Sequence, residues 1–581
     1  MQNKQQKLRT CLQENHYILP SFQAYGGLSG FQDYGVEGSK VKNKFLSVWR
    51  EFFLNDIADT IVEIETPAIV PYNILKASGH VDRFTDFIVY DKYNICYRAD
   101  HLAKNWFKTN NMIDMADKVD TWDQSTLEEN INKYNMLNQT VTVEKKNLMF
   151  DVAFTTPEDI NFLRPEIAPA MFVNFKLIQQ YLKTNCPFGI AQIGKSYRKE
   201  ISPSPYTRMR EFNQAEIEYF VDPLNKTHKN FNKYKDIKIP LLTADMQQKN
   251  NFEYILVSVD EAVSSGLIKQ QIMAYFLAKI YMFALKIGLK EKNIRFRQHM
   301  SHEMAHYAIE CWDLEAYVNN DWLECVGCAD RGSFDLQTHS KYGNMQLSAK
   351  RQLKKSIEQI TLEPKLNLKL IGKTIGKFTP IVVKDFENFT QENLKEIKDK
   401  IDNNEFSIKF DNTIYPITKE MITIEQVTKI IDYEEFYPHV IEPSFGIDRL
   451  LYAVFEQNFW ARDNDDQRIV LSLPKILCPY DVAVVTLSKN DELNKLVDSI
   501  HTMLFKYGIK CYRDDSSISI GKKYARLDEL GISTVITVDF DSLKDNKVTL
   551  RDRDTTKQNR VSINNELVTT GDSVWMITQV Y

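Results

Sequence analysis

The sequence predicts a mixed α/β fold in two parts, a large N-terminal part and a smaller C-terminal α/β domain. An amphipathic pattern over residues 42–58 predicts a helix, and residues 60–66 predict the strand that follows it. Two β-rich apolar runs, 188–196 and 211–221, flank a turn-forming Ser-Pro-Ser-Pro segment, which predicts a β-hairpin. From Ile469 onward strand and helix patterns alternate, as expected for a compact layered α/β domain.

Length and composition indicate a globular protein of more than one domain. The chain has 581 residues, of which 43% are hydrophobic and 26% charged. We expect no membrane span, because no apolar run reaches some 18 residues. The polar first ten residues lack the apolar core of a signal peptide, and the eight cysteines are scattered as expected of reduced thiols. These features predict a cytoplasmic protein, and the net charge of −5 confines nucleic-acid contacts to local patches.

Several further elements complete the N-terminal part. They are a largely helical inserted module at 103–147, a helix at 176–184, further insertions at 225–290 and 341–430, a helix at 448–458 and a charged linker at 462–466. Residues 341–400 hold 13 Lys or Arg against 7 Asp or Glu. Such a run is typical of a solvated surface, and an insertion that faces nucleic acid is the alternative.

The C-terminal domain is predicted from five alternating segments. They are strands at 482–487, 509–513 and 533–538 and helices at 492–507 and 521–530. Lys522, Lys523 and Arg526 are expected to form a cationic patch beside Asp514 and Asp515.

Two segments carry residue types suited to phosphate chemistry. The tip of the predicted hairpin holds Arg198 and Arg208, whose planar guanidinium groups donate paired hydrogen bonds, and Phe212 could stack on a purine. Residues 441–450 (IEPSFGIDRL) predict a strand, a Gly-containing turn and a helix that carries Arg449. Taken alone, these patterns also fit a surface hairpin laced with ion pairs and a plain strand–helix junction.

In this order, the helix and strand at 42–67, the hairpin and the segment 441–450 resemble motifs 1, 2 and 3 of the class II aminoacyl-tRNA synthetases. The resemblance is closer to the glycyl-tRNA synthetases of the eukaryotic and archaeal dimeric type. It rests on seven more segments: 26–35 (GGLSGFQDYG), 78–84 (SGHVDRF), 163–166 (LRPE), 191–194 (AQIG), 210–218 (REF and AEIE), 303–308 (EMAHYA) and 326–331 (VGCADR). Residues 514–526 (DDSSISIGKKYAR) resemble the anticodon-binding domain shared by the glycine, histidine, proline and threonine enzymes.

The resemblance implies a fold, an activity and partners. The expected fold is an α+β catalytic domain at 1–468, with an antiparallel sheet flanked by helices, and an anticodon-binding domain at 469–581. The expected activity is ATP-dependent activation of glycine to glycyl-adenylate and transfer to the 3′ end of tRNA(Gly), with release of pyrophosphate and AMP. Motif 1 implies a homodimer, because class II enzymes form their subunit interface there.

The resemblance also implies a glycine site. Glu166, Glu216 and Glu442 match the three carboxylates that surround the glycine ammonium, while Pro443 and Ser444 match pocket residues, Ser444 being the one that narrows it. Carboxylates suit a small cationic ligand. Without glycine such a cluster repels itself, so at least one pKa should be raised.

An ATP site is implied in the same way. Arg198 matches the arginine on the α-phosphate, and Arg449 the one near the γ-phosphate and adenine; these two are the expected catalytic residues. Glu324 is a candidate ligand for Mg²⁺. The expected ATP-binding set is Arg198, Lys199, Glu200, Arg208, Met209, Phe212, Glu324, Cys325 and Arg449.

The chain departs from the family pattern at two places. Asp448 stands where a Gly-Leu-Gly-Arg motif usually has glycine, and an acid there could weaken the field on the triphosphate. Ile167, Pro169 and Ala170 replace the usual Thr, Gln and Gly after the Arg-Pro-Glu motif, next to the expected pocket floor.

Three other readings compete. Residues 302–306 (HEMAH) satisfy the H-E-x-x-H pattern of zinc peptidases, in which one helix face holds both histidines. Cys325 and Cys328 could form half of a zinc site, although buried free thiols are the simpler interpretation and we expect no zinc. A paralogue that only binds nucleic acid would have lost the arginines or glutamates, and this chain has them all.

Overall fold

The computed structural model describes residues 2–55, 59–116, 118–156, 159–305, 307–411, 413–463 and 465–563. Two compact units are present: residues 1–347 together with 437–581, and residues 348–436. The described residues include no helix that is long and apolar enough to span a bilayer.

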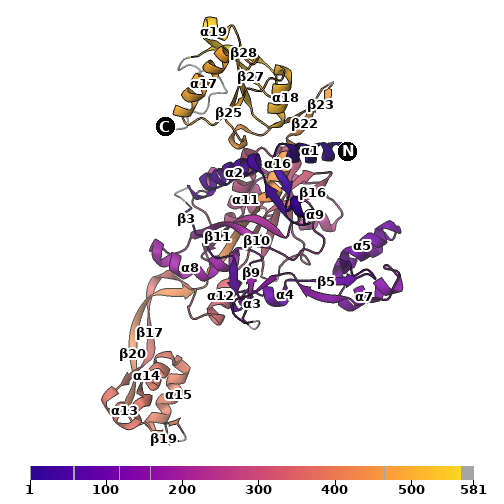
Figure 1. Cartoon of the computed structure of the whole chain (residues 1–581). Coiled ribbons are helices and arrows are strands. Elements are labelled where there is room, and N and C mark those ends of the chain that lie inside the picture. The colour runs from indigo at the N-terminus through magenta and orange to yellow at the C-terminus, as the bar shows by residue number, and fades with distance from the viewer. Residues whose placement is uncertain are drawn as a thin grey trace. The chain divides into compact units, whose positions relative to one another are not determined.

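A nine-stranded, largely antiparallel sheet forms the centre of the larger unit in the described residues (Figure 1). Its strands, in spatial order, are β13 (Ile255–Ser258), β12 (Lys238–Leu242), β14 (Ile294–Gln298), β15 (Glu310–Val318), β16 (Asp321–Asp330), β21 (His439–Gly446), β11 (Glu211–Val221), β10 (Phe188–Tyr197) and β3 (Ile61–Glu63). Only β12–β14 and β10–β3 run parallel among the pairs between these strands. The antiparallel sheet implied by the resemblance is therefore confirmed.

The predicted hairpin is the pair β10–β11, whose register runs from Phe188 opposite Phe220 to Tyr197 opposite Glu211. The predicted helix at 42–58 is α2 (Val36–Leu54), which begins six residues earlier because Gly35 occupies its N-cap position in extended conformation. Its apolar face packs Trp49 and Phe53 against Phe445 of β21. Helix and sheet thus share one core.

Three more helices pack on the sheet. They are α8 (Ala168–Leu182), α11 (Gln271–Lys286) and α16 (Ile447–Gln457). Helix α8 begins eight residues before the prediction, because its first turns are buried on most sides and show no amphipathic period. Residues 225–290, predicted as an insertion, supply β12, β13 and the almost wholly buried α11 to the core.

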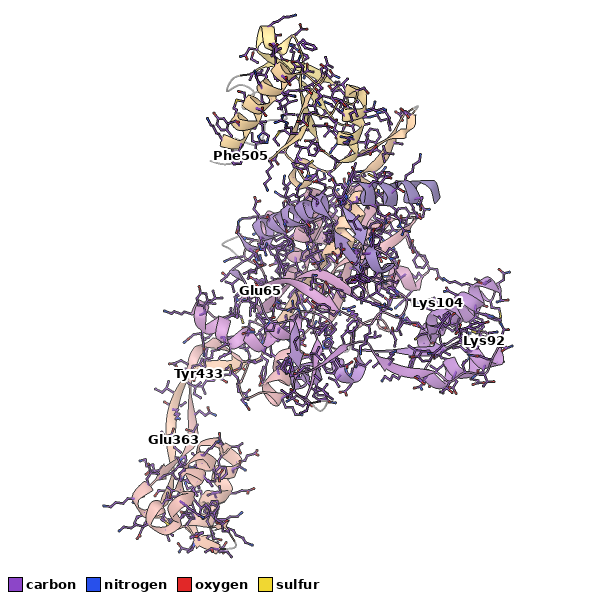
Figure 2. The ribbon with its side chains drawn as sticks, viewed as in Figure 1. Glu65, Lys92, Lys104, Glu363, Tyr433 and Phe505 are labelled. Atoms are coloured by element: carbon purple, nitrogen blue, oxygen red, sulfur yellow. The ribbon has the colours of Figure 1, made fainter. Side chains whose placement is uncertain are left out.

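The inserted module expected at 103–147 has a core of its own. Its sheet joins β5 (Thr85–Tyr90), β6 (Cys96–Arg98) and β7 (Glu144–Asn147), and its helices are α5 (Ala99–Thr109), α6 (Ile113–Ala116) and α7 (Gln124–Lys133). Phe107, Leu127 and Ile131 lie fully buried at its centre. Lys92 and Lys104 belong to this module (Figure 2).

Residues 348–436 form the second unit. Strands β17 (Ala349–Leu366) and β20 (Ile422–Phe436) pair as a long ribbon, on which Glu363 and Tyr433 lie (Figure 2). The ribbon carries α13 (Leu368–Ile375), α14 (Thr379–Asn388), α15 (Gln391–Asp402) and the hairpin β18–β19 (Ser407–Phe410 and Thr413–Pro416) around a small apolar core. The Lys-rich run is thus largely part of a folded unit, and whether it faces nucleic acid stays a prediction.

The C-terminal segment contains the five predicted elements within one or two residues. They are β24 (Val482–Thr486), α17 (Asp491–Lys506), β25 (Cys511–Asp514), α18 (Ile520–Glu529) and β26 (Thr534–Val538), and β27 (Lys547–Asp552) and β28 (Gln558–Ser562) complete a sheet of five among the described strands. The linker expected at 462–466 is wrong. Strands β22 (Phe459–Arg462) and β23 (Asp465–Leu471) form a hairpin there, and Arg462 pairs with Asp528.

The cationic patch expected in this segment is also wrong in part. Lys523 is fully buried and donates to the carbonyl oxygens of Thr486 and Asp514, while Arg526 pairs with the Asp514 carboxylate. Only Lys522 remains exposed and basic without such a contact to Asp514. The boundary proposed at 468 lies inside β23 and stays a prediction.

Candidate active site

A cavity of about 430 Å³ opens on one face of the central sheet, over β11, β15, β16 and β21. Twelve of the fourteen predicted site residues line it: Glu166, Arg198, Glu200, Arg208, Met209, Phe212, Glu216, Glu324, Cys325, Glu442, Ser444 and Arg449. The other two do not. Lys199 pairs with Asp151 at 2.6 Å, and Pro443 is buried within β21.

One end of the cavity is a buried cluster of carboxyl groups. Glu216 of β11 and Ser444 of β21 lie opposite each other in the strand register, and Ser444 Oγ donates to Glu216 Oε1 at 2.8 Å. Glu442, two residues before Ser444 on the same face of β21, accepts both hydrogen bonds of Arg331 Nη1 at 2.9 and 3.0 Å. The sheet register therefore brings these groups together.

Arg331 is the residue that the sequence reading missed. It follows directly after β16, is 1% exposed, and also donates to Asp335 of α12 (Phe334–Tyr342) through Nε at 2.9 Å. Its guanidinium lies 4.0 Å from the centre of the Tyr307 ring. Buried arginine of this kind neutralises neighbouring acids. Its position at the end of the VGCADR segment was the available signal.

Glu166 holds a negative charge in the same pocket. It follows β9 (Ile160–Leu163) and precedes α8, and its Oε1 lies 3.3 Å from His80 Nε2 of α4 (His80–Arg83) and 3.9 Å from Arg331 Nη2. Burial raises the pKa of this carboxyl, but His80, Arg331 and Arg198 outweigh it and lower the pKa to about 2. Glu166 is therefore ionised at neutral pH.

The other two predicted glutamates behave in the opposite way. Burial, together with the charges of Glu442 and Glu166, raises the pKa of Glu216 to about 8. Burial also raises the pKa of Glu442 to about 7, although Arg331 opposes the rise. The expectation that an empty cluster raises at least one pKa is confirmed.

The other end of the cavity is basic and open. The guanidinium of Arg198 lies between the rings of Phe84 and Phe212, 5.3 and 5.2 Å from their centres, and its Nε donates to the Pro165 carbonyl oxygen. Arg449 of α16 is 32% exposed and donates to the carbonyl oxygens of Thr207 and Glu324. Both arginines are thus fixed along their stems, with N–H donors left for an anion.

Asp448 does not stand free beside Arg449. Its carboxylate accepts hydrogen bonds from Tyr34 Oη at 2.5 Å and from Asn213 N and Nδ2 at 2.7 and 2.9 Å. Burial raises the pKa of Asp448, against those hydrogen bonds. Its role is to tie α16 to β11 and β2 (Gln32–Tyr34), so the concern that it weakens the field on the triphosphate loses its geometric basis.

Two of the quoted segments, 163–166 and 191–194, pack against each other, and Glu166 of the first lines the cavity. Arg164 is buried and donates to the carbonyl oxygens of Thr66 and Lys195. A side chain at Gly194 would come within 2.2 Å of Arg164 Nη2, so this position requires glycine. Ile167 packs next to them as a fully buried apolar group, which accounts for the departure from threonine there.

Comparison with known proteins decides which family has this arrangement. The chain is 40% identical to the glycine–tRNA ligase of Methanocaldococcus jannaschii over 97% of both chains. It is 38% identical to glycine–tRNA ligase 1, mitochondrial, of Saccharomyces cerevisiae, covering 96% of this chain and 89% of that one. The chain belongs to the glycine–tRNA ligase family.

Two further comparisons concern the C-terminal segment and the fold. Residues 481–569 match the family model described as "Anticodon binding domain". The fold resembles Giardia lamblia prolyl-tRNA synthetase in complex with prolyl-adenylate, with a TM-score of 0.53 at 12% identity over 97% of this chain and 74% of that one. At that identity the likeness concerns the fold alone, which is that of a class II synthetase.

The zinc-peptidase interpretation requires the H-E-x-x-H segment to lie on a helix, and the described residues of that segment do not form one. Residues 301–305 form turns, and Glu303 accepts hydrogen bonds from Arg297 Nη1 and from the backbone N–H of Met300. His306 lies outside the described residues. Cys325 and Cys328 are buried and form no disulfide, and the expectation that they hold no zinc stays a prediction.

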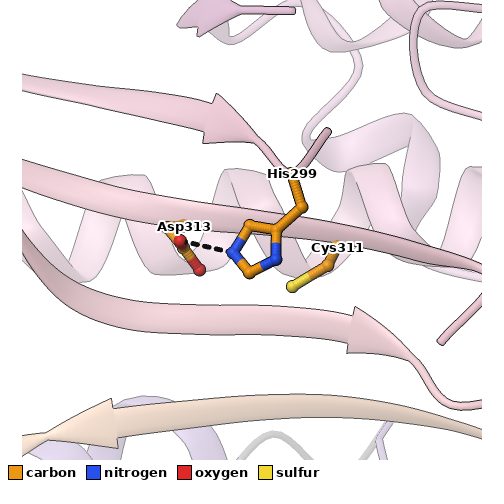
Figure 3. A group of neighbouring side chains, drawn as sticks. All are labelled: His299, Cys311 and Asp313. Carbon is orange, nitrogen blue, oxygen red and sulfur yellow. Dashed lines mark hydrogen bonds and ion pairs between the residues drawn. The ribbon is translucent and has the colours of Figure 1, made fainter. Parts of the chain in front are cut away.

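His299, Cys311 and Asp313 form a further group at the cavity wall (Figure 3). His299 Nε2 lies 2.6 Å from Asp313 Oδ2, and Asp313 raises the pKa of His299 against the effect of burial. Burial raises the pKa of the Cys311 thiol well above its usual range. The imidazole–carboxylate pair satisfies both of its members without an ion, and the neutral thiol needs none.

Proposed function

We propose that this chain binds glycine at the carboxyl end of the cavity and ATP at the basic end, in keeping with its membership of the glycine–tRNA ligase family. The observation that carries the proposal is the charge division of a single cavity, with buried acids at one end and the arginines Arg198 and Arg449 at the other. Glycine presents an ammonium to acids and a carboxylate to cations, so it fits across this division.

Glycine recognition then rests on charge and on exclusion. The ammonium is assigned to Glu166, Glu216 and Glu442, of which Glu166 is already ionised by His80 and Arg331. Ser444 is fixed by its hydrogen bond to Glu216 and closes the space where a side chain would project. A steric wall matters because a pocket that merely prefers one methylene less discriminates by only about 1–3 kcal/mol.

The first reaction step joins the two ends. The glycine carboxylate attacks the α-phosphorus of ATP in line, and the bond to the β-phosphate oxygen breaks to release pyrophosphate. Arg198 is assigned to the α-phosphate, where its pre-placed charge stabilises the transition state. Arg449 is assigned to the γ-phosphate and adenine, and Phe212 and Met209 to the base and ribose.

The second step transfers glycine to tRNA(Gly). The terminal ribose hydroxyl attacks the adenylate carbonyl, loses its proton and displaces AMP. No protein nucleophile is needed in either step, so the chain contributes positioning and fixed charge.

Mg²⁺ is the proposed cofactor, with Glu324 as its protein ligand. The Glu324 side chain is 57% exposed at the cavity, and its Oε1 lies 3.6 Å from Arg449 Nη1. An exposed carboxylate beside the arginine assigned to the triphosphate suits a hard cation that binds both carboxylate and phosphate oxygens. When bound, the ion would neutralise charge on the triphosphate.

The remaining proposals concern partners and place. Residues 469–581 are proposed to bind the anticodon stem-loop, α2 and β3 to form a C₂ homodimer interface, and the scattered free thiols to reflect a cytoplasmic location. Light scattering that finds only monomer at micromolar concentration would overturn the dimer.

ATP–pyrophosphate exchange with each of the twenty amino acids tests the proposed function. We expect exchange with glycine and background rates with the other nineteen. Exchange that is equal for alanine and glycine would overturn the pocket assignment, and no exchange with any amino acid would overturn the activity.

A further inference from the structure

Glu218 is a buried acid that the proposed function does not use. It is 0% exposed, and neither of its carboxyl oxygens has a hydrogen-bond partner among the described residues. Buried polar atoms of this kind are rare in folded proteins and require an explanation. Glu218 does not line the cavity, so it lies behind the proposed glycine site rather than in it.

The strand register sets Glu218 against other acids. Strands β11 and β21 pair through Glu216–Ser444 and Tyr219–Ile441, which puts Glu218 directly opposite Glu442. Glu216 lies two residues away on the same face of β11. Carboxyl oxygens of all three glutamates lie within 4.8 Å of one another, and like charges directly opposite on neighbouring strands repel.

The nearby cations cannot neutralise all of these acids. Arg331 donates to Glu442 and Asp335 and, among the described residues, to neither oxygen of Glu218, although its charge acts to lower the pKa of Glu218. His80 faces Glu166, and Arg198 lies on the nucleotide side of the same carboxylate. The charged or titratable groups around the cluster are Glu166, Glu216, Glu218, Glu442, Asp335, Arg331, Arg198, Arg164, His80 and Tyr307. Five acids therefore share at most four cations.

We infer that the cluster holds at least two protons when glycine is absent, one retained permanently by Glu218 as a neutral acid and one on Glu216 that leaves to solvent when the glycine ammonium binds. Glu218 is a positioning residue, because a neutral acid behind Glu216 and Glu442 lets both approach one ammonium without a further charge. The inference rests on the proposed glycine site.

The electrostatics of the described residues agree with this division. Burial, and after it the charge of Glu442 on the neighbouring strand, raises the pKa of Glu218 well above its usual range, although Arg331 opposes the rise. With a pKa of about 8, Glu216 carries its proton in about nine of ten molecules at pH 7. The Glu216 carboxyl dissociates to a carboxylate and a proton, which the buffer takes up. The side chains of the pocket therefore become more negative by one charge as the ammonium enters.

Calorimetry on the full-length protein tests the proton release. Glycine is titrated at pH 7 into the protein in two buffers of different ionisation enthalpy, such as phosphate and Tris. We expect the difference in binding heat to report roughly one proton released per glycine. Glycine that binds with no dependence on the buffer would overturn the inference while leaving the proposed function intact. Failure of glycine to bind would overturn the proposed function instead.

Infrared absorption spectra recorded separately with and without glycine test the permanent proton on Glu218, because a band that glycine does not affect cancels in a difference between the two. We expect two carbonyl bands of protonated carboxylic acids, one lost on glycine addition and one unaffected by it. The unaffected band should vanish in Glu218→Gln, the glycine-sensitive band in Glu216→Gln, and neither in the exposed control Glu387→Gln. A wild-type spectrum with no glycine-insensitive acid band would overturn the role of Glu218, and this result does not depend on any variant folding.

Discussion

The two ends of the cavity differ in how they obtain specificity. At the carboxyl end, Glu216, Glu218 and Arg331 are between 0 and 2% exposed and are fixed by strand register. At the basic end, carbonyl oxygens accept hydrogen bonds from Nε of Arg198 and of Arg449, and two rings flank Arg198. Other N–H groups of both guanidinium groups face the open cavity. The first arrangement suits selection of a ligand without a side chain. The second suits a triphosphate that must enter, react and leave.

The largest effect is expected from the basic end. Arg198→Ala should raise the barrier to adenylate formation by about 3 kcal/mol or more, which lowers the rate over 100-fold, because the positive charge beside the reacting phosphate is lost. Pyrophosphate exchange measures this, and the exposed Arg513→Ala in the C-terminal segment is the matched control. An Arg198→Ala enzyme with near-normal exchange would show that the basic end has been misassigned.

The carboxyl end should fail differently. Glu216→Gln preserves the shape of the side chain and removes the charge that receives the ammonium. The binding free energy of glycine should weaken by about 1.5–3 kcal/mol, so the glycine KM should rise about 10- to 150-fold. The KM for ATP should stay close to wild type. Glu211→Gln, on the same strand but outside the cavity lining, is the control. Normal glycine binding by Glu216→Gln would remove the distinction between the two ends.

The variant Ser444→Gly separates the steric exclusion of a side chain by Ser444 from the binding of the ammonium by the carboxylates. We expect a change of about 1–3 kcal/mol in the glycine-to-alanine ratio of kcat/KM, with little change in ATP use. The effect should be smaller in glycine activation itself than that of Glu216→Gln. An unchanged ratio would mean that another group closes the pocket.

The smallest expected effect is a pH dependence of stability. The pKa of Glu216 is raised to about 8 in the folded protein, so its contribution to stability is present below the unfolded pKa near 4.5 and is lost as pH rises through 8. The melting temperature of the protein without glycine should therefore fall between pH 6 and 8. Glycine should restore more stability at pH 8 than at pH 6. A glycine-induced Tm shift that shrinks over this range would contradict the sign.

The residues predicted from sequence and those missed differ in a physical way. Glu216 and Ser444 were found because each lies in a contiguous quoted segment. Arg331, His80 and Glu218 also lie in such segments, but their roles come from contacts with residues far away in the sequence, as between Arg331 and Glu442, which are 111 positions apart. The register of two strands, which no single segment encodes, decides that Glu218 faces Glu442.

Fold prediction failed where burial and charge conflict. Lys523 is a basic residue on an amphipathic helix, but its ammonium finds carbonyl acceptors inside the C-terminal sheet. The charged segment at 462–466 was read as a linker because its polarity hides a short hairpin, which Arg462 anchors to Asp528. Polar pairs of this kind satisfy buried charge without leaving an apolar pattern.

The central claim is that buried acids, rather than contacts to a side chain, select glycine. Pyrophosphate exchange by wild type and Glu216→Gln, measured with glycine and alanine over a range of concentrations, tests it most directly. The account predicts exchange with glycine alone in the wild type, and a raised glycine KM with unchanged ATP KM in the variant. Equal activation of alanine by the wild type, or an unchanged glycine KM in Glu216→Gln, would contradict it.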